Sequence, residues 1–174
     1  MTDMETVIYE TRPEWDDGPW INEPDRAIWR HNNMVCLIRR HERSGHLCGY
    51  VGVGPDHPFH GRTWQGCALP EPCTVDEWAC CDHRIDSRIE VHGGLTYARA
   101  CDDDPILGIC HLPAPGEPDH LWWFGFDCAH VWDMSPNPQR RVGYLDGQYR
   151  TFIYVRDETE NLADQLKAAA SPTR

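Results

Sequence analysis

The chain has 174 residues, of which 16 are lysine or arginine and 28 are aspartate or glutamate, so its formal net charge is −12. This excess of negative charge repels phosphate backbones and disfavours general nucleic-acid binding. The length and an apolar content of 40% fit one compact domain with its own hydrophobic core.

Residues 1–33 are predicted to form an N-terminal lead-in with one strand, at residues 6–9, followed by a loop rich in proline and tryptophan. Residues 34–169 are predicted to form a single α+β domain. Its first two strands are the apolar run at residues 34–38 and its hairpin partner at residues 46–54, which are joined by a short turn.

Residues 62–87 are rich in cysteine and are predicted to be an insertion into this domain. Thr74 and Glu77 form the capping-box pattern that starts a helix, which predicts a short helix near residues 74–81. Glycines and prolines interrupt the chain that follows, so we expect a mostly antiparallel sheet with loop-rich connections. Further extended segments are predicted at residues 88–92, 95–98 and 109–112.

Residues 121–133 read Leu-Trp-Trp-Phe-Gly-Phe-Asp-Cys-Ala-His-Val-Trp-Asp. Side chains alternate on a strand, and both faces are largely apolar here, which predicts a central strand covered on two sides. The residues predicted to share one face are Trp122, Phe124, Phe126, Cys128 and His130.

Apolar side chains recur at steps of three and four between residues 151 and 169. This spacing predicts an amphipathic C-terminal helix that closes the sheet. Residues 170–174 are expected to be a frayed tail.

A candidate metal centre lies at the end of the aromatic strand. Cys128 and His130 are two positions apart, and thiolate and imidazole both suit zinc. His92 precedes Gly93 and Gly94, and glycine permits a tight turn there. We therefore predict zinc ligation by His92, Cys128 and His130, with the two imidazoles within about 8 Å of each other.

The same residues are the candidate catalytic group. His92 and His130 would act with Asp127 or Asp133, one of which orients a ligand or serves as a base. His57 and His60 lie in a proline-containing loop, and at least one of them is predicted to border the same cleft. A simpler interpretation makes the cysteine a small buried hydrophobe.

The cysteine-rich insertion offers an alternative structural zinc site. Its spacings do not match the tight two-residue knuckle of strong zinc motifs. The candidate ligands are Cys67, Cys73, Cys80, Cys81 and His83.

The chain has nine cysteines, an odd number, and it lacks a secretory pattern at its start. We therefore expect a reducing cytoplasm, with thiols free or bound to metal. No apolar run approaches the ~20 residues of a membrane span.

Four blocks of sequence resemble a family of uncharacterised proteins from actinobacterial phages and their hosts. They are Cys-Gly-Tyr-Val-Gly-Val at 48–53, His-Pro-Phe-His-Gly at 57–61, Val-His-Gly-Gly-Leu-Thr-Tyr at 91–97 and Trp-Trp-Phe-Gly-Phe-Asp-Cys-Ala-His at 122–130. The resemblance covers roughly residues 34–169. It implies phage origin, a shared scaffold, a variable region at 62–87 and a motif that continues to Asp133, but it implies no activity.

Two functions stay open. The first is a phage accessory protein, in the host cytoplasm, with a zinc-dependent hydrolytic site for a nucleotide or other small molecule. The second is a non-catalytic accessory protein that binds and inhibits a host defence protein. In the second, exposed tryptophans such as Trp15, Trp20 and Trp29 would serve as interface anchors.

Overall fold

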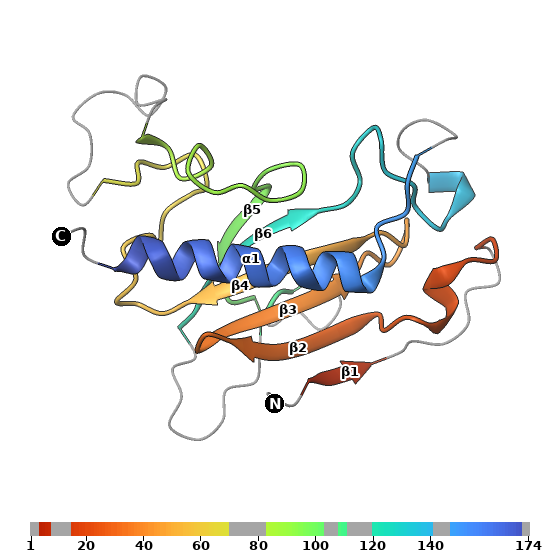
Figure 1. Ribbon diagram of the computed structural model, residues 1–174, viewed down its shortest axis with the longest axis horizontal. Helices are drawn as coiled ribbons and strands as arrows, with labels where there is room; N and C mark the ends of the chain where they lie inside the picture. The colour runs from red at the N-terminus through yellow and green to blue at the C-terminus, as the bar shows by residue number, and fades with distance from the viewer. Residues whose placement is uncertain are drawn as a thin grey trace.

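The computed structural model describes residues 4–7, 15–69, 83–102, 108–110, 120–140 and 147–171. Within them, six antiparallel strands form one sheet in the order β1-β2-β3-β4-β6-β5, and helix α1 lies across one face of it (Figure 1). The predicted α+β class, with an antiparallel sheet and a C-terminal helix, is confirmed. The elements are β1 (Glu5–Val7), η1 (Pro19–Asn22), β2 (Arg26–His31), β3 (Met34–Arg40), β4 (Leu47–Val53), β5 (Tyr97–Ala100), β6 (Trp122–Asp127), η4 (Pro138–Arg140) and α1 (Phe152–Ala170).

The predicted hairpin is present as β3 and β4, whose register runs from Val35 opposite Gly52 to Arg40 opposite Leu47. The lead-in was predicted to contain a single strand, and this was wrong because β2 pairs along the whole length of β3. Its alternating residues Ala27 and Trp29 are buried under α1, which is the burial pattern of a sheet with one covered face.

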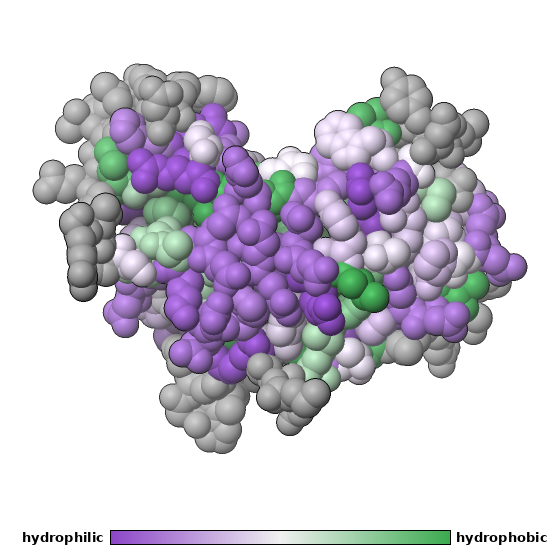
Figure 2. All heavy atoms as spheres, in the orientation of Figure 1, coloured by the Kyte–Doolittle hydropathy of each residue, from purple (hydrophilic) through white to green (hydrophobic). Residues whose placement is uncertain are grey.

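The aromatic strand β6 is central, as predicted, because it pairs with β4 on one side and β5 on the other. Phe124 and Phe126 join the core beneath α1, whereas Trp123 belongs to the smaller core on the opposite face. The helix begins at the N-cap Thr151, whose hydroxyl accepts a hydrogen bond from the Tyr154 amide. Figure 2 shows mostly hydrophilic residues on the side of the molecule that carries α1.

Residues 88–92 were predicted to be a strand, and this was wrong. Side chains of α1 occupy the backbone groups that a neighbouring strand would use. Gln165 bonds both the amide and the carbonyl of Glu90, and Asn161 Nδ2 donates to the same carbonyl. The segment is thereby fixed against the helix. Ile109 and Cys110 are not in a strand either, and the helix predicted near 74–81 lies outside the described residues.

Cys101 and Cys110 form a disulfide, with their Cα atoms 4.8 Å apart. The expectation that all thiols are free or bound to metal is therefore wrong for this pair. The bridge ties the chain just after β5 to residue 110, a link that composition alone did not reveal. Among the other described cysteines, Cys36, Cys48 and Cys128 are buried and free.

Candidate metal centre

Three side chains from two separate turns meet beside the N-terminal half of α1. His92, His130 and Asp133 each offer one ligand atom, and these atoms all lie within 4.8 Å of one another. The ring centroids of the two histidines are 5.3 Å apart, so their predicted proximity is confirmed. This group could hold a metal ion.

Backbone geometry brings the two turns together. Gly93 and Gly94 have φ angles of 67° and 84°, in the left-handed region that favours glycine. A Cβ atom on Gly93 would collide with the imidazole of His130, so the close approach also requires the missing side chain. In the second turn, the Asp133 amide donates to the His130 carbonyl at 2.9 Å.

Asp133 is the hub of the group, and its side chain is fully buried. Its Oδ2 atom lies 2.8 Å from His92 Nε2 and 3.2 Å from His130 Nδ1, while Oδ1 accepts from Arg150 Nε at 2.8 Å. Burial would raise the pKa of this carboxyl. The hydrogen bonds from Arg150, His92 and the His130 amide outweigh that effect, and the pKa lies below its ordinary value.

Helix α1 orients His92 from the other side. The Tyr154 hydroxyl lies 3.0 Å from His92 Nδ1, and Glu158 Oε2 accepts from the His92 amide at 2.9 Å. A partner on the remote ring nitrogen is the usual way in which proteins fix a metal-binding histidine. These supporting residues were not predicted, although Tyr154 and Glu158 are one helical turn apart and so share a face of the predicted helix.

Cys128 was predicted as a ligand, but its sulfur does not belong to the cluster. Strand β6 ends at Asp127, so the alternation that placed Cys128 and His130 on one face stops there. Cys128 is 2% exposed, and burial raises the pKa of its thiol far above the ordinary value. Asp133 occupies the place in the cluster that had been predicted for the cysteine.

Asp127 also lies outside the cluster. One of its carboxylate oxygens accepts from Thr96 Oγ1 and the other from the Ala129 amide. These bonds shape the turn that leads from β6 to His130. The structure therefore gives Asp127 a role in positioning the turn.

His57 and His60 do not border this site, and the prediction that one of them would was wrong. His57 Nε2 donates to the Leu166 carbonyl, and His60 Nε2 lies 3.0 Å from the His120 carbonyl. Leu166 follows Tyr154 by three helical turns, about 18 Å along α1. The loop that carries both histidines therefore meets the opposite end of the helix.

Of the alternative zinc ligands, only Cys67 and His83 fall in the described part of the chain. They lie in two segments that run side by side, because Cys67 bridges to Arg84 and the Ala68 amide donates to the His83 carbonyl at 2.6 Å. Cys73, Cys80 and Cys81 lie outside the described residues. The alternative site stays a prediction.

A cleft of about 430 Å³ lies directly against His92. Its described lining is polar and contains carboxylates and amides but no lysine or arginine. The lining residues are Glu90, Val91, His92, Tyr154, Glu158, Asn161 and Gln165.

Trp20 and Trp29, predicted as exposed interface anchors, are both buried. The indole of Trp29 bonds Glu160 of α1, and that of Trp20 bonds the Asp16 carbonyl. Among the tryptophans that the structure describes, Trp132 is the exposed one; it is 52% exposed and stacks on the His130 ring at 5.5 Å. Its neighbour Val131 is 46% exposed, so an apolar surface adjoins the cluster.

Comparisons of the chain with protein-family models, with curated proteins and with solved structures each find no match. Among the helices that the structure describes, none is both long enough and apolar enough to cross a membrane. The interpretation of the site therefore rests on its geometry and chemistry.

Proposed function

We propose that the protein is a phage-type accessory protein that acts in the host cytoplasm, where it binds zinc through His92, His130 and Asp133 and hydrolyses a small molecule. The convergence of two imidazoles and one carboxylate, with ligand atoms within 4.8 Å, carries this proposal. Two histidines and one carboxylate are a ligand set of catalytic zinc sites, and such sites leave a fourth position for water.

Zinc in this site would supply the nucleophile. It would lower the pKa of a bound water towards neutrality. Held by His92, His130 and Asp133, the ion would thereby activate a water for hydrolysis. His130 is the partly exposed side chain of the three, so solvent reaches the group from its side.

The cleft beside His92 bears on the class of substrate. Glu90 and Glu158 give its described lining a negative character, which repels phosphate groups. We therefore favour an uncharged or cationic polar molecule over a nucleotide. The nucleotide remains the other candidate, and the same assay tests both.

Metal content is the first test. The full chain, purified without chelator, is expected to contain about one equivalent of zinc by elemental analysis, and chelation should lower its melting temperature because the metal binds the native state. A protein without metal whose melting temperature does not respond to added zinc would contradict the proposal.

Two variants locate the site. His130→Gln should lose the zinc, whereas His60→Gln, a matched control at a histidine far from the cluster, should keep it. If His130→Gln retained its zinc, the metal would belong to another site, such as the cysteine-rich segment. Activity is then measured with the zinc-loaded chain on ester, amide and nucleotide substrates, and His130→Gln should abolish any turnover found.

A second function is favoured by the exposed Val131 and Trp132. We propose as the alternative that this surface binds and inhibits a host defence protein without catalysis, with the buried His92 network serving only to hold the turn. Residues at the centre of such interfaces are enriched in tryptophan.

Expression in host cells separates the two functions. Any inhibition of a host defence system should be lost in Trp132→Ala but retained in His130→Gln if binding alone is responsible. If the enzyme is responsible, His130→Gln should lose the effect. An effect retained by both variants would contradict both functions.

A further inference from the structure

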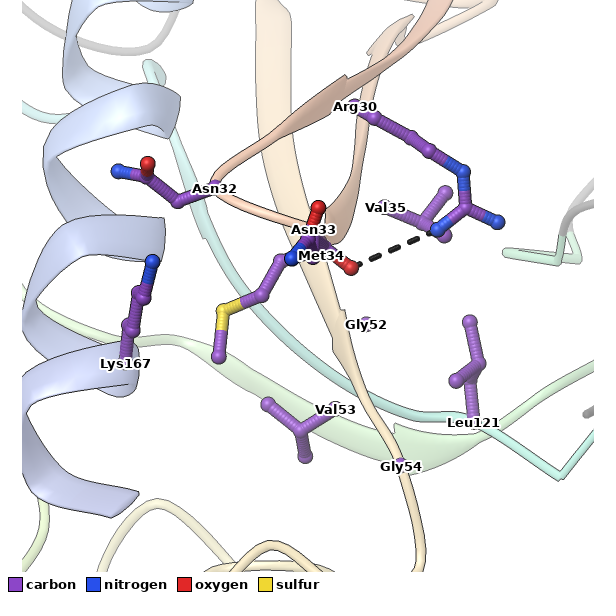
Figure 3. A pocket seen from close by; sticks show the side chains of 10 residues that line it. All are labelled: Arg30, Asn32, Asn33, Met34, Val35, Gly52, Val53, Gly54, Leu121 and Lys167. Atoms are coloured by element: carbon purple, nitrogen blue, oxygen red, sulfur yellow. Dashed lines mark hydrogen bonds between the residues drawn. The ribbon is translucent and has the colours of Figure 1, made fainter. Parts of the chain in front are cut away.

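A second hollow, of about 500 Å³, lies at the opposite end of the sheet from the group of His92, His130 and Asp133. It is formed where the β2–β3 turn, the end of β4 and the chain just before β6 come together, next to the last turns of α1 (Figure 3). Lys167 borders it, and this residue follows Tyr154 on α1 by about 20 Å. The volume is in the range of small-molecule pockets.

The body of the hollow is apolar. Met34 and Val53 lie on one side of β4, and Val35 and Leu121 lie on the other (Figure 3). Leu121 occupies the space beside Gly52, whereas Gly54, just after the end of β4, carries no side chain to fill the hollow. A Cβ atom built on Gly54 meets nothing within 4 Å, so the backbone there faces open space.

The charges at its rim are positive although the chain carries a net charge of −12. Among the described lining residues, only Arg30 and Lys167 are charged. Arg30 Nη1 donates to the Asn33 carbonyl at 3.4 Å, and this bond directs the guanidinium along the rim. Figure 3 shows Arg30 on one side of β4 and the tips of Lys167 and Asn32 on the other.

Asp164 lies one helical turn before Lys167 on α1. It accepts hydrogen bonds from Asn32 Nδ2 and lies 2.8 Å from His31 Nε2. It is not among the residues that line the hollow. The interaction with Asn32 also fixes the β2–β3 turn, whose Asn32 and Asn33 have φ angles of 51° and 70°.

We propose that this hollow binds a small organic anion, a flat apolar body that carries a single carboxylate, sulfonate or phosphate group. The body would lie over Gly54 against the aliphatic side chains, and the anionic group would meet Lys167 or Arg30. A site of this kind combines burial of apolar area with a few placed polar groups. It is separate from the metal cluster and does not depend on the function proposed there.

Two dyes with the same aromatic body test the proposal on the full chain. Anilinonaphthalene sulfonate carries one negative charge, and phenylnaphthylamine carries none. The sulfonate is expected to bind at one site with a fluorescence increase, and its affinity should exceed that of the uncharged dye by about two- to fivefold, the equivalent of one partly exposed charge interaction. Equal affinities would overturn the assignment of an anion.

Variants locate the binding. Gly54→Phe places a ring in the hollow, and it should weaken binding of the sulfonate by about tenfold or more because the ring and the dye exclude each other. Lys167→Gln or Arg30→Gln, whichever removes the cation that meets the sulfonate, should weaken it by about two- to fivefold. Arg88→Gln, which removes an exposed arginine that does not line the hollow, is the matched control and should leave the affinity unchanged.

Circular dichroism and thermal melting establish that each variant is folded. A folded Gly54→Phe that binds as tightly as the parent chain would overturn the proposal. If Gly54→Phe does not fold, amide chemical shifts of the parent chain decide instead. Shifts on dye binding should cluster at residues 32–35 and 52–54, and shifts confined to other segments would overturn the proposal.

Discussion

His46 is a buried histidine in the turn between β3 and β4, away from the group of His92, His130 and Asp133. Its Nδ1 atom lies 2.8 Å from the Ser44 hydroxyl, and its ring stacks on His41 at 4.9 Å. Burial, with a further contribution from His41, lowers its pKa to about 4. The folded protein therefore keeps this imidazole neutral at pH values where the unfolded chain protonates it.

This difference predicts a loss of stability in mild acid. The unfolded imidazole titrates near pH 6.5, so between there and pH 4 the unfolded chain binds more protons, and stability falls as pH falls. The contribution of His46 is fully present above that range and should decline by about 2 kcal/mol by about pH 5. Urea unfolding of the parent chain and of His46→Gln, each at about pH 6.5 and at about pH 5, measures this decline in stability. An identical pH dependence in both proteins would contradict the assignment.

Tyr154 provides a test of how His92 is positioned. Tyr154→Phe removes the hydroxyl partner of His92 Nδ1, and it should lower zinc affinity by about tenfold, as for other partners of metal ligands. Tyr97→Phe is the matched control, because Tyr97 packs against the smaller core on the opposite face of the sheet. Zinc titration monitors affinity, and urea unfolding monitors stability. A variant that loses stability without losing affinity would show that the hydroxyl is only structural.

The histidines of the cluster could be predicted from the sequence because each one adjoins a strong local signal. His92 precedes two glycines, and His130 follows an aromatic strand. Asp133 could not be distinguished from Asp127 in the same way, because the choice depends on where the strand ends. Extending the strand alternation beyond Asp127 is what placed Cys128 in this cluster, whereas the structure places Asp133 there.

Among the strands, β6 supplies two buried phenylalanines, Phe124 and Phe126, to the core beneath α1. Phe126 is 1% exposed and lies beneath α1, so Phe126→Ala should lower the free energy of unfolding by roughly 3–5 kcal/mol. Ile153→Ala, at a position that is 63% exposed on α1, is the control and should cost less than about 1 kcal/mol. Urea unfolding measures both. Similar losses for the two variants would refute the central place of β6 in the core.

The contact between α1 and β4 depends on a glycine. A Cβ atom on Gly49 would collide with Thr159 Oγ1 and would lie 2.7 Å from the Phe126 ring. Gly49→Ala should therefore destabilise the protein by about 1–3 kcal/mol through overpacking. Gly54→Ala, just after the end of the same strand, where a Cβ meets nothing within 4 Å, should not. Equal melting temperatures for the two variants would argue against this tight helix–sheet contact.

Long apolar runs with a clear period predicted β3, β4, β6 and α1. Strand β2 was missed because its buried residues, Ala27 and Trp29, alternate with arginines and follow a proline-rich segment. Residues 88–92 have strand-like alternation, but α1 takes their backbone partners through Gln165 and Asn161. Such side-chain bonds depend on tertiary contacts between distant residues, which local pattern does not contain.

For the whole molecule, the disulfide between Cys101 and Cys110 should contribute to stability. The two cysteines are nine positions apart in sequence. In the chain-entropy description, closing a loop this short stabilises the folded protein by about 2–3 kcal/mol. Cys110→Ser should lower the melting temperature, and a reducing agent should lower that of the parent chain but not of the variant. Peptide mapping without reduction identifies the linked peptides, and finding both thiols free would contradict the pairing.

The helix that covers the sheet comes after all six strands in the chain. During synthesis, the apolar face that contains Cys36, Val51 and Phe126 is therefore complete before residues 152–170 exist to cover it. An uncovered apolar sheet associates readily with other chains. We therefore expect the growing polypeptide to be prone to association through this face until α1 leaves the ribosome and covers it.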